Sequence, residues 1–374
     1  MAPVSFGAVT PPIGLDIGTD HVRAVQVRPS GSGPILSSYA SVGVPYGAVV
    51  EGEIIDAEAV AGALKDLWRT GGFRSKEVAV GVSNQKVVVR LIDLPFMEKA
   101  ELAGAIQYQA QDYIPIPIDE AILSHEVIGD YVTAADEHMM EVLLVAAQRD
   151  MISDLVHAVE GAGLKLMQID VTAFALVRSL LGESSVLFPD EHENSEAVGL
   201  IHVSSGITNI AVVEGGVTRF TRVSSQAGSQ FTQAVSSVLN LTFDEAETLK
   251  LQVGLPALDG SAPAVPAGVD PQVVGAAQEA LEREANKFIG EVRRSLDYYL
   301  TQAAQLRTIK RIILTGSGAA LRNFPAYLAN GLQTEVVIGD PLSQVQLASS
   351  VEPAVMADRL GVAPAIGLAL GGLD

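Results

Sequence analysis

The chain has 374 residues and a formal net charge of −20, because 44 Asp and Glu residues outnumber 24 Lys and Arg residues. This length predicts two or more domains, and 48% hydrophobic residues are ample for their cores. The absence of cysteine excludes disulfides, thiolate metal sites and a cysteine nucleophile, and the negative charge argues against nucleic acid as a partner.

No stretch of the sequence predicts a membrane span. The apolar segment Gly361–Gly372 is well below the roughly 20 residues that a spanning helix needs. Met1–Pro12 lacks the basic and apolar regions of a signal peptide. We therefore expect a cytoplasmic protein.

The first predicted elements form a hairpin. An apolar strand, Ile13–Asp16, leads through Gly18 and Thr19 into a second strand, Val22–Val27. A strand that ends in Asp and turns back through Gly-Thr places backbone N–H groups and a hydroxyl around a concave turn, which suits a terminal phosphate.

Two charged residues of this hairpin extend the hypothesis. Asp16 would hold hydrated Mg²⁺ through water, since Mg²⁺ prefers oxygen ligands and keeps several waters. Arg23 would supply a positive charge from the second strand. The alternative is an ordinary hairpin with a glycine in its turn, and the motif alone leaves both interpretations open.

Helices and a strand are predicted over the next part of the chain. Apolar periodicity predicts helices at Glu98–Tyr113 and Asp150–Gly161, and the strand Lys165–Ile169 follows the second of them. Residues 113–118 are predicted to be extended, because each of their two prolines fixes φ and disfavours helix for the residue before it.

The same order of strands returns half a chain later. Ala197–Val203 and Ile207–Val213 form a second hairpin, and a Glu-Gly-Gly turn leads to Val217–Val223. The repetition indicates two similar halves, although a pattern alone leaves coincidence open. Small donors flank the glycine of the first turn and suit phosphate oxygens: Ser204, Ser205, Gly206 and Thr208.

The C-terminal part predicts a loop, a long helix and a glycine-rich turn. Leu255–Pro271 is rich in Pro, Ala and Gly and is predicted to be a loop. Leu281–Leu300 predicts an amphipathic helix with Glu284 among the residues on its polar face. The strand from Arg311 then leads through Gly316, Ser317 and Gly318 towards a helix, a junction that faces anions or nucleotides in many α/β folds.

Together, in this order, these three turns resemble the phosphate-1, phosphate-2 and adenosine motifs of the actin, Hsp70 and hexokinase superfamily of ATP-binding proteins. The resemblance implies two domains that hold ATP and Mg²⁺ in a cleft. Ala246–Lys250 resembles the superfamily helix that reaches the nucleoside, which implies Glu247 and Lys250 as ribose or adenine contacts. A solvated helix that carries Glu and Lys is the alternative.

Within this superfamily, the chain is most similar to the PilM family of type IV pilus assembly proteins, which is related to the division protein FtsA. The similarity rests on Tyr113–Glu120 and Ala365–Gly371, with further matches at Val80–Asn84 and Arg293–Leu296. It implies an α/β, actin/Hsp70/FtsA-like two-domain fold with duplicated ribonuclease H-like cores and inserted subdomains 1C and 2B.

The resemblance also implies subdomain boundaries. In chain order these are 1A at 13–85, 1C at 86–164, 1A again at 165–196, 2A at 197–224, 2B at 225–308, 2A again at 309–345 and a return to 1A at 346–374.

The family role implied is that of a cytoplasmic ATP-binding adaptor. It would bind the N-terminal cytoplasmic tail of the membrane protein PilN in a groove around 1A and 1C, and would be peripheral to the inner membrane through the proteins of the pilus platform. Self-association into a homo-oligomer is left open. The alternatives are a sugar-type kinase of the same superfamily and an FtsA-like filament-forming protein.

Two departures from the motifs bear on hydrolysis. His202 stands where the phosphate-2 motif usually has an aspartate, and a neutral imidazole is a poor partner for Mg²⁺. Ser204 replaces a motif glycine where close approach to phosphate is wanted. Asp170 aligns loosely with the residue that orients the attacking water in related ATPases. We expect nucleotide binding with slow or absent hydrolysis.

Overall fold

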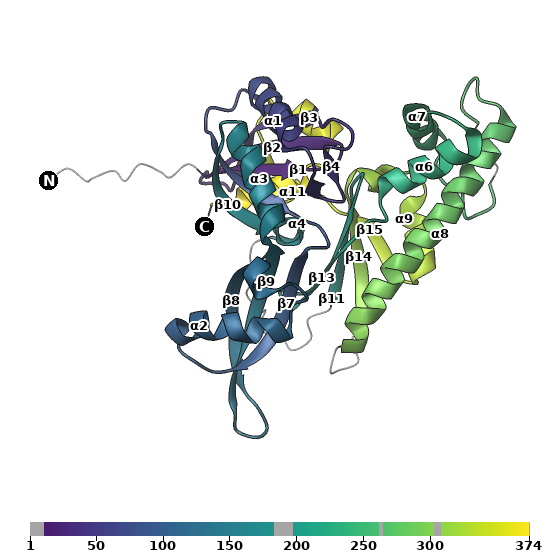
Figure 1. Cartoon of the computed structure of the whole chain (residues 1–374). Coiled ribbons are helices and arrows are strands. Elements are labelled where there is room, and N and C mark those ends of the chain that lie inside the picture. The colour runs from purple at the N-terminus through teal and green to yellow at the C-terminus, as the bar shows by residue number, and fades with distance from the viewer. Residues whose placement is uncertain (1–10, 183–196, 262–264, 303–307, 374) are drawn as a thin grey trace.

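The computed structural model describes residues 11–182, 197–261, 265–302 and 308–373. Two β-sheets form the centres of its two halves (Figure 1). The first sheet contains β1 (Ile13–Ile17), β2 (His21–Arg28), β3 (Ile35–Gly43), β6 (Glu77–Val82), β10 (Lys165–Val171) and β16 (Gln346–Leu347). The second contains β11 (Ala197–Val203), β12 (Thr208–Glu214), β13 (Val217–Ser224), β14 (Ile309–Thr315) and β15 (Glu335–Ile338).

Five strands of the first sheet correspond in order and direction to the five strands of the second. Their orders are β10-β6-β1-β2-β3-β16 and β13-β12-β11-β14-β15. Each has three consecutive antiparallel strands, a fourth strand parallel to the first of them and a fifth strand parallel to the fourth. The first sheet has β16 as a sixth strand, which pairs in parallel with β3. The predicted duplication and the actin/FtsA-like α/β fold class are therefore confirmed.

Helices cover the first sheet on both faces. On one face, Leu15 and Val80 share a core with α1 (Ala57–Gly71) and α3 (Arg149–Gly161). On the other face, α11 (Ala363–Leu370) lies against β1 and α4 (Thr172–Leu181). Gly367 permits this contact, because a Cβ there would overlap the carbonyl group of Ala175.

The second sheet is covered by helices on one face and by α4 on the other. The first of these faces packs in one core with α6 (Gly228–Leu239), α7 (Phe243–Val253), α8 (Pro271–Gln302) and α9 (Phe324–Leu332). On the other face, Leu200 and Ile313 pack against Phe174 of α4. Helix α4 therefore lies between the halves and joins their cores.

A third sheet is inserted between β6 and α3. It has the order β7-β9-β8, and it lies below the first sheet in Figure 1. Its elements are β7 (Val87–Pro95), β8 (Ala121–Val132) and β9 (His138–Gln148), with α2 (Lys99–Gln109) packed on it. The segment 113–118 was expected to be extended throughout, but Tyr113 has φ of −116° and ψ of −19° and Ile118 begins the 3-10 helix η2 (Ile118–Glu120). Ile114 and Ile116 pack against this small core.

The remaining elements are short. They are the strands β4 (Val49–Val50) and β5 (Glu53–Ile54), the helix α10 (Glu352–Ala357) and the 3-10 helices η1 (Ala110–Asp112), η2 (Ile118–Glu120) and η3 (Ser317–Ala320). None of the helices in the described ranges combines the length and the apolar composition needed to cross a membrane.

The long helix α8 corrects two details of the sequence prediction. It begins at Pro271, well before Leu281, because proline is tolerated at the first helical position and Val274 and Ala277 continue the buried face. Glu284 was expected on the polar face but is buried, since it lies one turn from both Leu281 and Phe288. Its carboxylate is paired with Lys287 at 2.9 Å.

Candidate functional site

The turns of the two equivalent hairpins meet at the centre of the molecule. In the β1–β2 turn, the Gly18 N–H donates to the His21 carbonyl at 2.9 Å. In the β11–β12 turn, the Ser204 hydroxyl donates to the Ile207 carbonyl at 2.8 Å. Thr19 lies directly against Gly206, where any Cβ would overlap the threonine side chain. The two halves therefore touch at the predicted phosphate-binding turns.

A small cavity of about 50 Å³ lies beside this contact. A volume of this size holds only a few water molecules. Six of the predicted phosphate or metal residues line it: Asp16, Gly18, Thr19, Arg23, Ser204 and Ser317. The structure thus brings together residues from both hairpins and from the glycine-rich turn after β14.

A larger cavity of about 370 Å³ lies next to the small one. It is lined by five predicted nucleotide residues: Ser205, Glu247, Lys250, Ser317 and Gly318. Asp20 and Ser317 line both cavities, so the two are adjacent. The larger volume lies in the range of small-molecule sites.

Helix α7 presents Glu247 and Lys250 to the larger cavity. The helix starts at a capping box, in which the Thr242 hydroxyl accepts the N–H of Glu245 and the Glu245 carboxylate accepts the N–H of Thr242. Lys250 Nζ lies 2.6 Å from Glu247 Oε2 and 3.0 Å from Thr232 Oγ1. The lysine charge is thereby compensated where it is buried, and Glu247 is the more exposed of the pair, at 38%.

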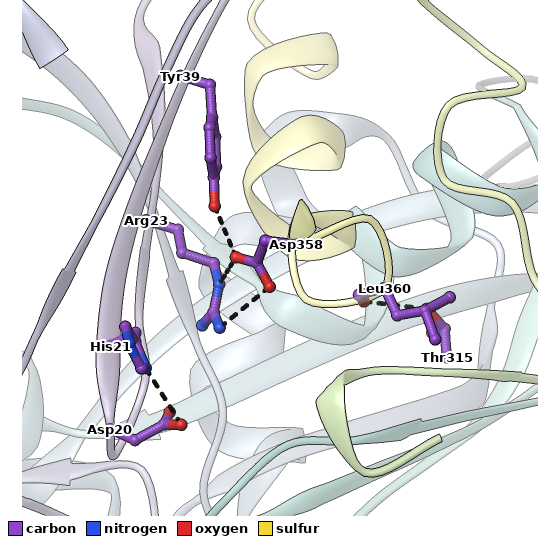
Figure 2. Close-up of polar contacts among 7 residues, drawn as sticks. All are labelled: Asp20, His21, Arg23, Tyr39, Thr315, Asp358 and Leu360. Atoms are coloured by element: carbon purple, nitrogen blue, oxygen red, sulfur yellow. Dashed lines mark hydrogen bonds and ion pairs between the residues drawn. The ribbon is translucent and has the colours of Figure 1, made fainter. Parts of the chain in front are cut away.

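Arg23 is the buried cation of the small cavity. Its Nε donates to Asp358 Oδ2 at 2.6 Å, and its Nη2 lies 3.5 Å from Asp358 Oδ1 (Figure 2). The Tyr39 hydroxyl also donates to Asp358 Oδ2, at 2.6 Å. Burial and this bond raise the pKa of Tyr39, so its proton remains in place at neutral pH.

The two strand ends of the site differ in charge. Burial raises the pKa of Asp16 to about 6, against the opposing effect of Arg23. Burial lowers the pKa of His202 to about 3, and the nearby Arg23 charge adds to this shift. At neutral pH, β1 therefore ends in a carboxylate and β11 in a neutral imidazole. Of these two groups, Asp16 is the oxygen ligand that suits hydrated Mg²⁺.

Four predicted residues line neither cavity: Gly206, Gly316, Asp170 and Thr208. The last two use their side chains elsewhere. Asp170 Oδ2 forms an ion pair with Arg178 at 2.6 Å, and its Oδ1 accepts the N–H of Val171 at 2.8 Å. The Thr208 hydroxyl donates to the Gln226 carbonyl at 2.7 Å, within its own half. Both groups stabilise strand ends in the described structure.

The glycines Gly206 and Gly316 shape the site. Gly206 allows the contact with Thr19. Gly316 has φ of 91°, a conformation that side chains rarely adopt, and its N–H donates to the Leu360 carbonyl at 3.1 Å.

Sequence reasoning missed several residues of the small cavity. Ser83 and Asn209 line it, and the Ser83 hydroxyl donates to Asn209 Oδ1 at 2.5 Å, from one half to the other. The end of β6 could have been placed beside Asp16 from the rule that ligands bind at the carboxyl ends of strands in open α/β sheets. Asp358 and Tyr39 line a further cavity of about 570 Å³, which Arg23 also lines. They carry no comparable signal, because Asp358 lies 335 positions from Arg23.

Comparison with known proteins gives matches over most of the chain. The family described as type IV pilus assembly protein PilM matches residues 14–261 and 274–373. The cell division protein FtsA of Escherichia coli (strain K12) is 25% identical over 384 aligned positions, which cover 94% of this chain and 89% of FtsA.

Two solved structures show the same architecture. The PilM-PilN type IV pilus biogenesis complex contains a chain with a TM-score of 0.79 and 25% identity, over 97% of this chain and 99% of that one. MreB 5 of Spiroplasma citri bound to AMPPNP has a TM-score of 0.53 and 15% identity, over 97% and 96%. The second likeness bears on the fold alone.

Proposed function

This chain belongs to the type IV pilus assembly protein PilM family, and from that premise we propose that it is a nucleotide-binding adaptor of the pilus inner-membrane platform. It would act in the cytoplasm and bind the N-terminal tail of PilN. The observation that carries the proposal is the likeness to a chain of the PilM-PilN complex over 97% of this chain and 99% of that one.

The two adjacent cavities support the nucleotide part of the proposal. Glu247, Lys250 and Gly318 would receive the nucleoside of ATP in the larger cavity. Arg23 and the Thr19 turn would face the phosphates. The small cavity has a volume of only about 50 Å³, so the halves must separate at Thr19 and Gly206 for a triphosphate to enter.

The residues around Asp16 also suit magnesium. A bound Mg²⁺ ion would neutralise part of the phosphate charge, with Asp16 holding it through water. His202 is neutral and Asp170 is paired with Arg178, so we propose slow or absent hydrolysis. The protein would then use nucleotide to select between conformations of the cleft rather than to drive a reaction.

We retain the subdomain boundaries as part of the proposal. The small sheet β7-β9-β8 falls within the proposed 1C (86–164), and α6, α7 and α8 fall within the proposed 2B (225–308). Under this division, the second half supplies the nucleoside cavity and 1C supplies one wall of a groove for the partner.

We place the groove for the partner between β7 of the proposed 1C and β13 of the proposed 2A, and not around 1A and 1C as the resemblance implied. It has a volume of about 420 Å³. It is lined by residues 87–90 and Pro115 on one side and by residues 221–226 on the other. Both strands are the outermost of their sheets, so in the described structure each has a backbone edge that no further strand pairs with. Such edges accept an extended peptide as an added strand, and we place the PilN tail here.

The test is a titration with a synthetic peptide of the PilN cytoplasmic tail, in the presence of ATP, ADP or neither. Ser225→Trp should fill the groove and abolish binding, and Arg90→Ala should weaken it by removing an exposed charge at the wall. Arg69→Ala is the matched control, because Arg69 is 79% exposed on the remote helix α1. Full binding by Ser225→Trp would rule out this groove.

The alternatives predict other results. A filament-forming protein would sediment in the presence of ATP, and a sugar-type kinase would transfer phosphate to a small hydroxyl compound. We favour neither, because the family match and the likeness to a chain of the PilM-PilN complex both extend over nearly the whole chain.

A further inference from the structure

We infer that Asp358 and Tyr39 form a latch on Arg23, which a phosphate-bearing ligand must displace in order to bind. The inference rests on the proposed nucleotide site and concerns its regulation. The latch is defined here as Tyr39, Asp358 and the guanidinium of Arg23 (Figure 2).

The first step concerns the hydrogen bonds of Arg23. Its Nε and Nη2 face Asp358, which also accepts the Tyr39 hydroxyl. A phosphate offers the same pair of anionic oxygens that a carboxylate offers to a guanidinium. Asp358 therefore occupies the edge of Arg23 that would make the strongest contact with a phosphate.

The second step concerns charge. The carboxylates of Asp16, Asp20 and Asp358 all lie close enough to Arg23 to act on it electrostatically. His202 is buried and neutral, so it adds no positive charge to this group. A phosphate that entered with Asp358 in place would meet more negative than positive charge, whereas a phosphate that replaced Asp358 would keep the ion pair with Arg23.

The third step concerns the segment that carries Asp358. It joins α10 to α11, and beyond Asp358 it is bonded to the second half: the Leu360 carbonyl accepts the Gly316 N–H at 3.1 Å and the Thr315 hydroxyl at 3.2 Å. Arg359 pairs with Asp340 at 2.8 Å. The Asp358 side chain, by contrast, bonds to β2 and β3 of the first half.

The latch lies within the first half, because α10 and α11 on either side of Asp358 pack against β2 and β3 through Val355 and Val362, while Leu360 and Arg359 join the same segment to the second half. With the latch closed, Thr19 and Gly206 are in contact and the small cavity has only about 50 Å³. Displacement of Asp358 by a phosphate would release a side chain whose segment also bonds to the second half through the Leu360 carbonyl. Phosphate binding is therefore an exchange of anionic partners at Arg23.

The experiment compares three ligands by calorimetric titration: ATP, ADP and adenosine. Asp358→Asn keeps the shape of the side chain and removes its charge. It should bind ATP and ADP about tenfold more tightly than the wild type, the factor set by a difference of about 1.4 kcal/mol. Adenosine should bind equally to both proteins, because it carries no phosphate.

Two further variants make the result specific. Tyr39→Phe removes the hydroxyl that donates to Asp358 and leaves the charges of Asp358 and Arg23 in place. It should therefore tighten ATP binding by a smaller factor than Asp358→Asn does. If Asp358→Asn folds poorly, Tyr39→Phe provides the test. Asp340→Asn breaks the exposed pair with Arg359 in the same segment and should leave ATP affinity unchanged.

The outcomes separate the latch from the proposed function. If the wild type binds ATP and neither Asp358→Asn nor Tyr39→Phe binds it more tightly, the latch is wrong and the nucleotide site stands. If no protein in the series binds ATP, ADP or adenosine, the nucleotide site itself is wrong and the latch falls with it.

Discussion

The hairpins β1–β2 and β11–β12 occupy equivalent places in two sheets of the same topology, yet they carry different chemistry. The first ends in Asp16 and presents Arg23, whereas the second ends in the neutral His202 and closes its turn with the Ser204 hydroxyl. Duplication of a backbone therefore does not duplicate its electrostatics. The ionised groups that would meet a phosphate are gathered on one hairpin, and the other supplies shape and small donors.

Of the substitutions that test this difference between the hairpins, Arg23→Ala should have the largest effect on stability. It removes the cation of the charged hairpin and leaves the Asp358 carboxylate with only the Tyr39 hydroxyl on Oδ2. We expect a loss of about 2–4 kcal/mol in the free energy of unfolding, since removal of one partner of a buried ion pair leaves an uncompensated charge. Urea denaturation measures this change.

The control for this variant is Arg69→Ala, which removes an arginine that pairs only with Asp66 among the described ion pairs and is 79% exposed. It should change the free energy of unfolding by less than about 0.5 kcal/mol. An equal effect of the two substitutions would mean that Arg23 is not the buried charge on which the first hairpin depends.

Gly206→Ala tests the contact between the two hairpins. The new Cβ would overlap the Thr19 side chain, so the closed arrangement should lose about 1–3 kcal/mol of stability. Thr19→Gly in the same chain should restore most of it by removing the overlap. If the single variant is as stable as the wild type, the turns do not touch in solution.

Asp16→Asn tests whether the first hairpin ends in a buried, titrating carboxylate. The pKa of Asp16 is raised by burial from 3.8 to about 6, so its contribution to stability is fully present below pH 3.8 and is lost as the pH rises through 6. The asparagine variant, which does not titrate, should be more stable than the wild type at pH 8 by about 1–2 kcal/mol, after allowance for partial exposure of the site.

Thermal unfolding at pH 4 and at pH 8 measures the effect of Asp16→Asn. The gain should be absent at pH 4, where Asp16 is protonated in the native protein. His202 lowers the stability of both proteins as the pH falls from 6.5 towards 3, because its pKa is 6.5 in the unfolded chain and about 3 in the folded one, so it cancels in the difference between wild type and Asp16→Asn. A stabilisation of the same size at both pH values would show that Asp16 is not a buried titrating carboxylate.

The sequence predicts the strands and turns of this fold well, and it predicts contacts between residues far apart in the chain poorly. The strands of both hairpins follow from apolar runs broken by glycine turns, and these turns gave the candidate residues Thr19 and Gly206. The start of α8 was placed too late, because Val274 and Ala277 have no strong polar residues between them to show a helical period.

The residues of the candidate site were predictable only in part, because some of them meet through contacts between distant parts of the chain. Motif positions brought Asp16 and Arg23 to the cavity, but Asp358 reaches Arg23 from 335 positions away through tertiary packing alone. Asp170 was chosen from a loose alignment, and in the folded chain Arg178 on the following helix binds its carboxylate. Side-chain pairing of this kind depends on packing geometry that a linear pattern does not contain.

The central claim is that the two halves enclose a nucleotide between α7 and the turn after β14. Photo-crosslinking with 8-azido-ATP, followed by peptide mapping, tests it most directly. We expect the label in α7 (Phe243–Val253) or beside Gly318, and unlabelled ATP should prevent labelling. Labelling confined to the β7-β9-β8 sheet, or labelling that excess ATP does not reduce, would contradict the account.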